Sequence, residues 1–141
     1  MNLVGEYSYK LDDKGRLSLP SAFRKALPKD LYISLSPDED CLYVFDSKGF
    51  GKWVDSLFER DGGFDSSKLS HVHARTKLNS RAKSVDMDSS GRIGISAQQR
   101  AAAGLEKNVV VIGNTDHFEV WDAERWQSFA EKVDLKSIFT K

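Results

Sequence analysis

The sequence predicts an α+β fold, mainly β with short helices, built from two repeated strand-turn-strand-helix halves. Residues 12–19 recur as residues 88–95 and residues 42–46 recur as residues 118–122, in both cases 76 positions later and without a gap. The match covers about 45 residues per copy, which indicates a duplicated module. Short hairpins with few helices favour a small mixed or barrel-like β body over a parallel sheet.

The first half is expected to open with a strand over residues 7–11 and a turn over residues 12–15. Gly15 can take a positive φ without steric cost, and the side chain of Asp12 can bond the amides of the turn. The next strand, residues 16–19, has apolar residues on one face and polar residues on the other. The arginine at its start therefore lies at the base of the turn, on the solvent face of a two-stranded ribbon.

A short helix follows in each half. Pro20 opens the first one, which runs to residue 27 and ends at Pro28. In the second half, residues 97–103 take that place, and Gly104 stops the helix at the position that matches Pro28.

Another pair of strands comes next in each half. Apolar and polar residues alternate over residues 31–35, which predicts a strand. Residues 109–112, which are all β-branched, form the matching strand in the second half. Turns that contain Asp lead from these strands into residues 42–45 and 118–121.

Asp46 and Asp122 are placed to cap the helices that come after these strands. Both helices carry apolar residues at the spacing of one helical face. These residues are Phe50, Trp53, Val54, Leu57 and Phe58 in the first half and Trp126, Phe129, Ala130 and Val133 in the second. We expect the two stripes to be core or subunit contacts rather than a cofactor site.

Residues 61–63 break the chain between the copies, and residues 66–78 can form a further helix that is basic on one side and carries Leu69, Val72 and Thr76 on the other. The expected organisation is a first repeat over residues 5–50, a helical connection over 51–80, a second repeat over 81–126 and the end of a C-terminal helix over 127–141.

Composition narrows the class of protein. A chain of 141 residues is close to the usual size of one domain, so each copy alone lies near the lower limit for independent folding. No apolar run approaches membrane-spanning length, and the N-terminus lacks the layout of a secretory signal. Cys41 is the single cysteine, which excludes an intrachain disulfide and favours a reduced, cytoplasmic setting.

Charge is segregated along the chain although the net charge is zero. Residues 14–29 contain five basic residues and no acid, and residues 66–85 contain another five and no acid. Such segregation can give a neutral protein one positive face. The alternative is two solvated stretches that point in unrelated directions, and charge runs alone slightly favour that alternative.

These residues carry a resemblance to a known family. Asp-x-x-Gly-Arg followed by an apolar-alternating strand and a short helix resembles the swapped-hairpin module of AbrB-type bacterial transcription regulators. Two such modules in one chain, with Leu-Tyr-Val-Phe-Asp (residues 42–46) or Phe-Glu-Val-Trp-Asp (residues 118–122) before each second helix, resemble the MraZ family. The resemblance runs from about residue 3 to residue 133, and the recurrence at fixed register makes it specific.

The resemblance implies an AbrB-like double-split β-barrel that binds double-stranded DNA. MraZ-like proteins regulate the bacterial cell-division and cell-wall gene cluster that contains their own promoter, and they assemble into homo-oligomeric rings on direct repeats. The family's Asp-x-x-x-Arg motif carries over to Asp12 and Arg16, and to Asp88 and Arg92. We therefore expect a cytoplasmic, nucleoid-associated protein with no cofactor, no small-molecule substrate and no membrane partner.

A physical account of the motif stands beside this resemblance. An arginine such as Arg16 can enter a major groove, where its planar fork matches the O6 and N7 acceptors of guanine. An ionised Asp12 is repelled by phosphate, so its expected role is to fix the turn and align Arg16. The expected DNA-binding set is Lys14, Arg16, Arg24, Lys25, Arg92 and Arg100, with Asp12, Gly15, Asp88 and Gly91 shaping the turns. The alternative is that Arg16 only ties the turn to Asp12 as a local ion pair.

The two copies differ inside the turn. The first copy has Lys14, and the second has Ser90 at the matching position. The second turn therefore offers less positive charge, which leaves its share in base contact open.

The residues also suggest two other classes of function. An enzyme or metal site would have to come from His71, His73, His117, Cys41 and the acidic residues. His-x-His on a helix places the two rings on different faces, however, and no third ligand appears at a repeated position. We therefore expect neither catalysis nor a metal. The stronger rival is an AbrB-like, antitoxin-type protein-interaction module, which would show an exposed apolar tail, and residues 136–141 are expected to be too short for one.

Overall fold

The structure is a computed structural model that describes residues 1–140. The first half contains β1 (Glu6–Lys10), β2 (Arg16–Ser18), α1 (Ser21–Ala26), β3 (Asp30–Leu35), β4 (Leu42–Phe45) and α2 (Ser47–Ser56). The short 3-10 helix η1 (Glu59–Asp61) and α3 (Leu69–Arg81) connect it to the second half. The second half contains β5 (Lys83–Asp86), β6 (Arg92–Gly94), α4 (Ala97–Ala102), β7 (Asn108–Gly113), β8 (Phe118–Asp122), α5 (Ala123–Lys132) and α6 (Leu135–Phe139).

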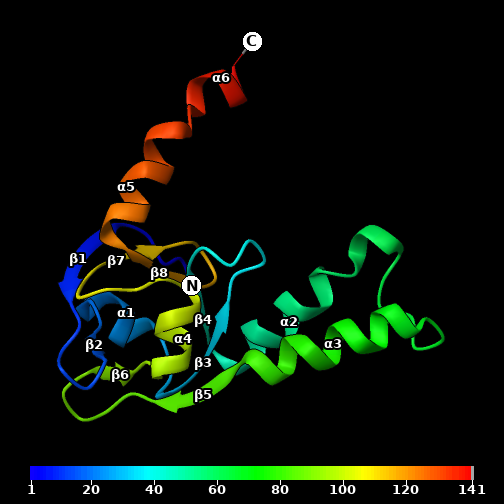
Figure 1. Ribbon diagram of the computed structural model, residues 1–141, viewed down its shortest axis with the longest axis horizontal. Helices are drawn as coiled ribbons and strands as arrows, with labels where there is room; N and C mark the ends of the chain where they lie inside the picture. Colours follow the sequence, from blue (N-terminus) through cyan, green and yellow to red (C-terminus); the bar gives the residue numbers. More distant parts are fainter. Residues whose placement is uncertain (141) are drawn as a thin grey trace.

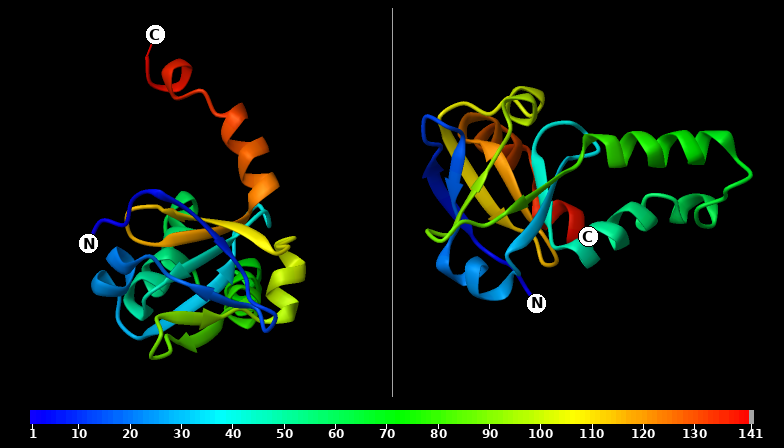
Figure 2. Two further views of the ribbon diagram at one scale, coloured as in Figure 1. Left: turned by 90° about the vertical axis from the view of Figure 1, so that its left-hand side faces the viewer. Right: turned by 90° about the horizontal axis from the view of Figure 1, so that it is seen from below.

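Strands of the two halves exchange partners. The main sheet is antiparallel in the order β1-β7-β8-β4-β3-β5, so the first strand of each half pairs with the third strand of the other. The remaining strands, β2 and β6, pair with each other as a separate two-stranded ribbon. Figures 1 and 2 show the ribbon beside the larger sheet, with strands of both halves intermixed. The expected α+β class is therefore confirmed, with the duplicated halves completing one body.

This exchange corrects two sequence-based expectations. The tight turn after β1 is present, but β1 and β2 do not form a ladder with each other, and the ribbon takes one strand from each half. The offset of 76 positions between the two halves does not hold along the whole chain. Val44 pairs with Ile33, whereas Val120, the residue that matches Val44, pairs with Val111. The third strands therefore match at an offset of 78, and compensating two-residue differences lie in the loops on either side.

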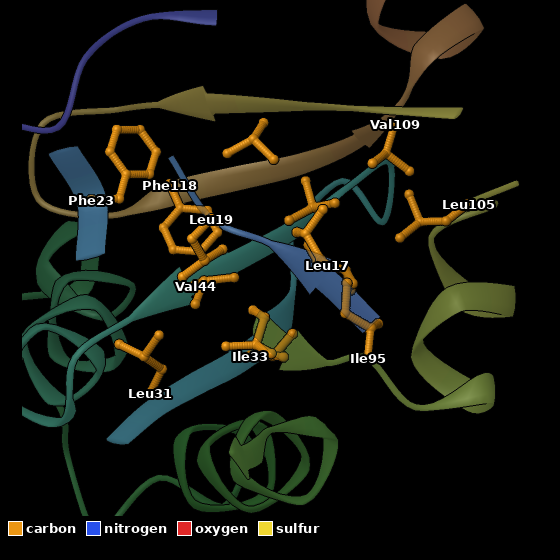
Figure 3. Close-up of a cluster of buried hydrophobic side chains, with 14 of the residues drawn as sticks. Leu17, Leu19, Phe23, Leu31, Ile33, Val44, Ile95, Leu105, Val109 and Phe118 are labelled. Carbon is orange, nitrogen blue, oxygen red and sulfur yellow. The ribbon is translucent and has the colours of Figure 1, made fainter. Parts of the chain in front are cut away.

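The main core lies between the ribbon and the six-stranded sheet. Leu17 and Ile93 form the central pair of the ribbon, and each side chain is 0% exposed. Figure 3 shows Leu17 and Ile95 beside side chains such as Ile33 and Val44 of the larger sheet. Burial of this apolar face fixes which side of the ribbon points outward, because a one-residue slip would reverse it.

A helical arm formed by α2, η1 and α3 projects from the body (Figure 1). The arm is anchored by a second apolar cluster of Phe45, Phe50, Val54 and Phe58. Asp46 caps α2 as expected, since its side chain accepts a hydrogen bond from the Gly49 N–H at 2.6 Å. Helix α3 begins and ends three residues later than expected, and Leu69, on its less basic side, is 70% exposed.

The C-terminal helices α5 and α6 extend away from the sheet in another direction (Figure 1). Asp122 caps α5 as expected, and Trp121 packs on Phe129 with ring centroids 4.7 Å apart. No residue of α5 is buried, and α6 exposes Leu135, Ile138 and Phe139. The expectation of a C-terminus too short for an exposed apolar segment is therefore wrong. Among the described residues, no helix has the length and apolar character to cross a membrane.

Candidate nucleic-acid interface

The arginines of the two repeated motifs lie on one ribbon. Arg16 stands opposite Gly94, and Arg92 stands opposite Ser18. Because Arg92 and Gly94 are two positions apart on one strand, Arg16 and Arg92 are diagonal neighbours on the same outward face. Both side chains are about one-third exposed, at 37% and 32%. The swap of strands therefore brings together two arginines that are 76 positions apart in the sequence.

Each aspartate holds its turn closed through the backbone. Oδ1 of Asp12 accepts hydrogen bonds from the N–H groups of Lys14 at 2.9 Å and Arg16 at 2.8 Å. Oδ1 of Asp88 accepts from Ser90 and Arg92 at 2.9 Å each. These bonds keep the carboxylates ionised. The backbone N–H of Arg16, first among several donors, lowers the pKa of Asp12 to about 2, and that of Arg92 likewise lowers the pKa of Asp88.

The second carboxylate oxygen orients the arginine. Nε of Arg16 donates to Oδ2 of Asp12 at 2.6 Å, and Nε of Arg92 donates to Oδ2 of Asp88 at 2.9 Å. A terminal nitrogen of Arg92 also lies 3.9 Å from Oδ2 of Asp12, which links the two motifs. The local ion pair weighed as an alternative role for Arg16 is therefore present in the structure.

That ion pair would leave free the edge of the guanidinium group that a contact to a base requires. Within residues 1–140, the hydrogen bond recorded for the Arg16 guanidinium uses Nε, which leaves the two terminal nitrogens directed at no protein acceptor. Those two nitrogens form the fork that pairs with O6 and N7 of guanine. An aspartate on Nε fixes the plane of that fork before any ligand arrives, so less side-chain entropy is lost on binding.

The turn glycines are required by conformation and by close packing across the two halves. Gly15 and Gly91 have φ values of +75° and +74°, which L side chains rarely adopt. A Cβ atom on Gly15 would collide with the guanidinium of Arg100, and one on Gly91 would collide with the side chain of Arg24. Each turn is therefore covered by an arginine from the short helix of the other half.

This crossed packing was not foreseen from the sequence. Arg24 and Arg100 were expected only as DNA contacts, yet Nη1 of Arg100 donates a hydrogen bond to the Ile95 carbonyl beside the Gly15 turn. The two arginines are 76 positions apart and so occupy matching places in the two halves, but the strand exchange determines which turn each one covers.

The two basic stretches of the sequence lie in different places. Lys14 and Lys25 are exposed, at the first turn and on α1. The second basic stretch lies mainly on α3, which projects on the opposite side of the body from α1 and the ribbon (Figure 1). The two stretches therefore do not form one continuous positive face, and the ribbon side carries its own cluster.

Histidine and cysteine lie apart from this ribbon. His71 is buried in the arm, where its Nδ1 accepts from the Asp65 N–H at 3.0 Å and its Nε2 lies 3.0 Å from Oδ2 of Asp61. Cys41 is buried beside Glu119, and burial raises the pKa of its thiol. Both residues are explained by local packing and hydrogen bonding.

Comparison with known proteins identifies the family of this chain. The family model described as "MraZ protein, putative antitoxin-like" matches residues 3–65 and again residues 78–141. A protein of Mycolicibacterium smegmatis named transcriptional regulator MraZ is 39% identical over 131 residues, which is 91% of this chain and 86% of the relative. Proteins of the same name are 40% identical over 131 residues in Mycobacterium tuberculosis, with the same shares of the two chains covered, and 37% identical over 129 residues in Saccharopolyspora erythraea, covering 92% of this chain and 87% of the relative. This chain, with its two Asp-Arg turns joined on one ribbon, belongs to the MraZ family.

Proposed function

We propose that this protein is a sequence-specific DNA-binding transcription regulator that acts as a homo-oligomeric ring on direct repeats. The proposed target is the cell-division and cell-wall gene cluster that contains its own promoter. Binding to that DNA would place the protein with the nucleoid in the cytoplasm. The MraZ resemblance and the names of the relatives support this assignment.

The observation that carries the proposal is the pair of arginines held diagonally on the outward face of the ribbon. A two-stranded β-ribbon fits the major groove of B-form DNA, and arginine paired with guanine is the commonest specific contact there. The two arginines of one chain would read neighbouring positions of one repeat. Arg16 has Lys14 beside it and Arg92 has Ser90, so we expect the first turn to contribute more to affinity.

Other basic residues would hold the DNA backbone. Lys14 is exposed at the first turn and Lys25 is exposed on α1, and the terminal groups of Arg24 and Arg100 lie over the turns. Contacts to phosphate position a protein on the duplex without reading its sequence. We assign Arg24 and Arg100 a double role, as covers of the turns and as phosphate contacts.

The test is fluorescence anisotropy with duplex DNA taken from upstream of the chain's own gene. We expect tight binding that weakens as salt rises, because cations are released from each phosphate contacted. The double variant Arg16→Ala/Arg92→Ala should lose the preference for this DNA over a scrambled duplex. Arg60→Ala, an exposed arginine of η1 in the arm, is the matched control and should bind as the wild type does. Equal affinity of the wild type for operator and scrambled DNA would contradict the proposal.

One observation supports a second candidate function. The α6 residues Leu135, Ile138 and Phe139 are 62%, 58% and 78% exposed, which suits contact with another protein. An antitoxin-type interaction module would use this surface for a different polypeptide and would not need the ribbon arginines. Mass photometry of the pure protein separates the two functions, since assembly without any partner favours self-contact through α6.

A further inference from the structure

The two short helices that carry the turn covers are anchored to the core in different ways. Helix α1 and its C-cap bury Phe23 and Leu27, which are 1% and 7% exposed. The matching positions of α4, each 76 residues later, are the buried residues Gln99 and Ala103. An amide and a methyl group remove far less apolar surface from water than a phenyl ring and a leucine side chain. Since α4 is also too short to be stable alone, it needs support from outside the core.

The start of α5 supplies such support at two points, and Figure 2 shows it beside the end of α4. Nη1 of Arg125 donates a hydrogen bond to the Ala103 carbonyl at 3.0 Å. Oδ1 of Asp122 accepts a hydrogen bond from the Glu106 N–H at 3.2 Å. The Arg125 guanidinium is also packed closely on Gly104, because a Cβ atom there would lie only 2.9 Å from it. The N-terminus of α5 thus holds the segment that follows α4.

The arginine of α5 completes the end of α4. Gly104 ends this helix with φ +68°, and the next residue, Leu105, donates its N–H to the Arg100 carbonyl at 2.8 Å. This pattern is typical of a helix that closes on a left-handed residue. The carbonyl of the C-cap residue, Ala103, is one of those that a helix leaves without an intrahelical partner. Arg125 satisfies it with a cationic donor, which is the charge favoured at a helix C-terminus.

The matching residue of the first half cannot make this contact. Gly49 stands at the position of Arg125, 76 residues earlier, and it has no side chain that could reach the end of α1. Pro28 stands at the position of Gly104, so α1 ends by a different device. The fold of the repeat therefore does not require an arginine at the start of the last helix. The link between α5 and α4 is a property of the second half.

Helix α4 in turn supports the first of the two turns on the ribbon. Arg100 projects from it over Gly15, and Nη1 of Arg100 donates to the Ile95 carbonyl. The Ile95 N–H donates to the Gly15 carbonyl at 2.9 Å, which ties the turn to the same strand end. Arg100 lies less than one helical turn before Ala103. Loss of the contact made by Arg125 would therefore loosen the part of α4 from which this cover projects.

We propose that Arg125 is a positioning residue for DNA reading, which acts through α4 and Arg100 on the turn that presents Arg16. This inference rests on the DNA-binding function proposed above. The other turn is covered by Arg24 of α1 at Gly91, so it does not depend on Arg125. Helix α5 leads directly into the exposed apolar helix α6. A second copy of the chain that packs on these two helices would therefore act on the first turn alone.

Hydrogen exchange of the full chain tests the positioning step without DNA. In Arg125→Ala, the Ile95 N–H should exchange several-fold faster than in the wild type. The Leu19 N–H, which donates to the Gly91 carbonyl at 3.1 Å, is the internal control and should keep its rate. Arg125→Lys retains a cationic donor and should restore most of the protection. Lys132→Ala, which removes an exposed cation at the other end of α5, should change neither amide. Equal acceleration of the two amides, or none at Ile95, would overturn the proposal.

The effect on DNA reading has a separate readout in operator affinity, measured by anisotropy. Arg125→Ala should lower the affinity several-fold, both in the wild type and in the Arg92→Ala background. In the Arg16→Ala background it should have little further effect, because the residue that it positions is gone. Equal losses in the two backgrounds would indicate a general effect on folding or assembly and would refute the specific role. A wild type that binds no operator would refute the proposed function, while the exchange result would still stand.

Discussion

Asp12 and Arg16 act as a pair, and each needs the other for its role. The carboxylate closes the turn through two backbone amides and holds Nε of the arginine with its second oxygen. The ion pair and the base-reading role proposed for Arg16 are therefore compatible, because they use different edges of the guanidinium group. A lysine at this position could not do both, since it has one compact ammonium group in place of a fork.

Arg16→Ala and Arg16→Lys are predicted to reduce specific DNA binding to a similar extent while the fold remains intact. The loss of one bidentate contact costs about 1–3 kcal/mol for each site, and a lysine keeps the charge without the fork. Anisotropy against operator and scrambled DNA, with circular dichroism as the folding control, measures this. Operator preference retained in Arg16→Ala would remove Arg16 from the base-reading role.

A prediction about pH follows from the lowered pKa of Asp12. Its folded-state pKa of about 2 lies below the ordinary value of 3.8, so the ionised carboxylate stabilises the folded turn above the ordinary value. That contribution is lost as pH falls from about 4 to about 2. In NMR spectra, the amide signals of Lys14 and Arg16 should keep their positions down to about pH 3 and move below it, and in Asp12→Asn this acid transition should be absent. A transition near pH 4 in the wild type would contradict the assignment.

At the scale of elements, the turns depend on contacts that cross between the halves. Leu19 donates its backbone N–H to the Gly91 carbonyl, and Ile95 donates to the Gly15 carbonyl. Together with the arginines over the glycines, these bonds make each turn a product of both repeats. Neither half could form a complete turn of this kind by itself.

Gly15→Val should therefore harm DNA binding more than a glycine substitution that causes only backbone strain. The variant forces a β-branched residue into φ +75° and also displaces Arg100. Gly62→Val is the matched control, because Gly62 has φ +86° but open space where its Cβ would lie. Thermal unfolding should show a cost of about 1–3 kcal/mol from strain in both variants, with a larger loss for Gly15→Val. Operator affinity should fall only in Gly15→Val, and equal affinities in the two variants would argue against a role for the covered turn.

The sequence predicted those parts of the fold that depend on neighbouring residues. The glycine turns, the caps at Asp46 and Asp122 and the burial of Leu17 follow from local chemistry and strand periodicity. The exchange of β1 and β5 between halves was not predictable from the pattern, because a strand with suitable alternation can pair with its own hairpin partner or with the other copy. The covers over the glycines depend on that exchange, so they could not be seen either.

At the scale of the whole molecule, the neutral net charge limits what one chain can do with DNA. A single ribbon supplies few phosphate contacts, and phosphate contacts dominate affinity. Several ribbons on one assembly would engage a repeated operator at high effective concentration, which raises the overall affinity without new contacts. The surface most available for such assembly is the apolar face of α5 and α6.

The last prediction is that assembly and operator binding fail together when this surface is made polar. Ile138→Ser/Phe139→Ser changes two exposed apolar side chains, so the fold of the body should be retained. Light scattering should show the wild type well above the monomer mass of 15.8 kDa and the variant shifted toward it. The wild type should bind an operator of several repeats far more tightly than a single repeat, whereas the variant should bind both with the same low affinity.

Lys136→Ser, a polar change on the same helix, is the control and should assemble normally, because it removes no apolar contact. A monomeric wild type that bound one repeat as tightly as the full array would refute the ring, and the ribbon arginines would then have to supply the whole affinity within one chain.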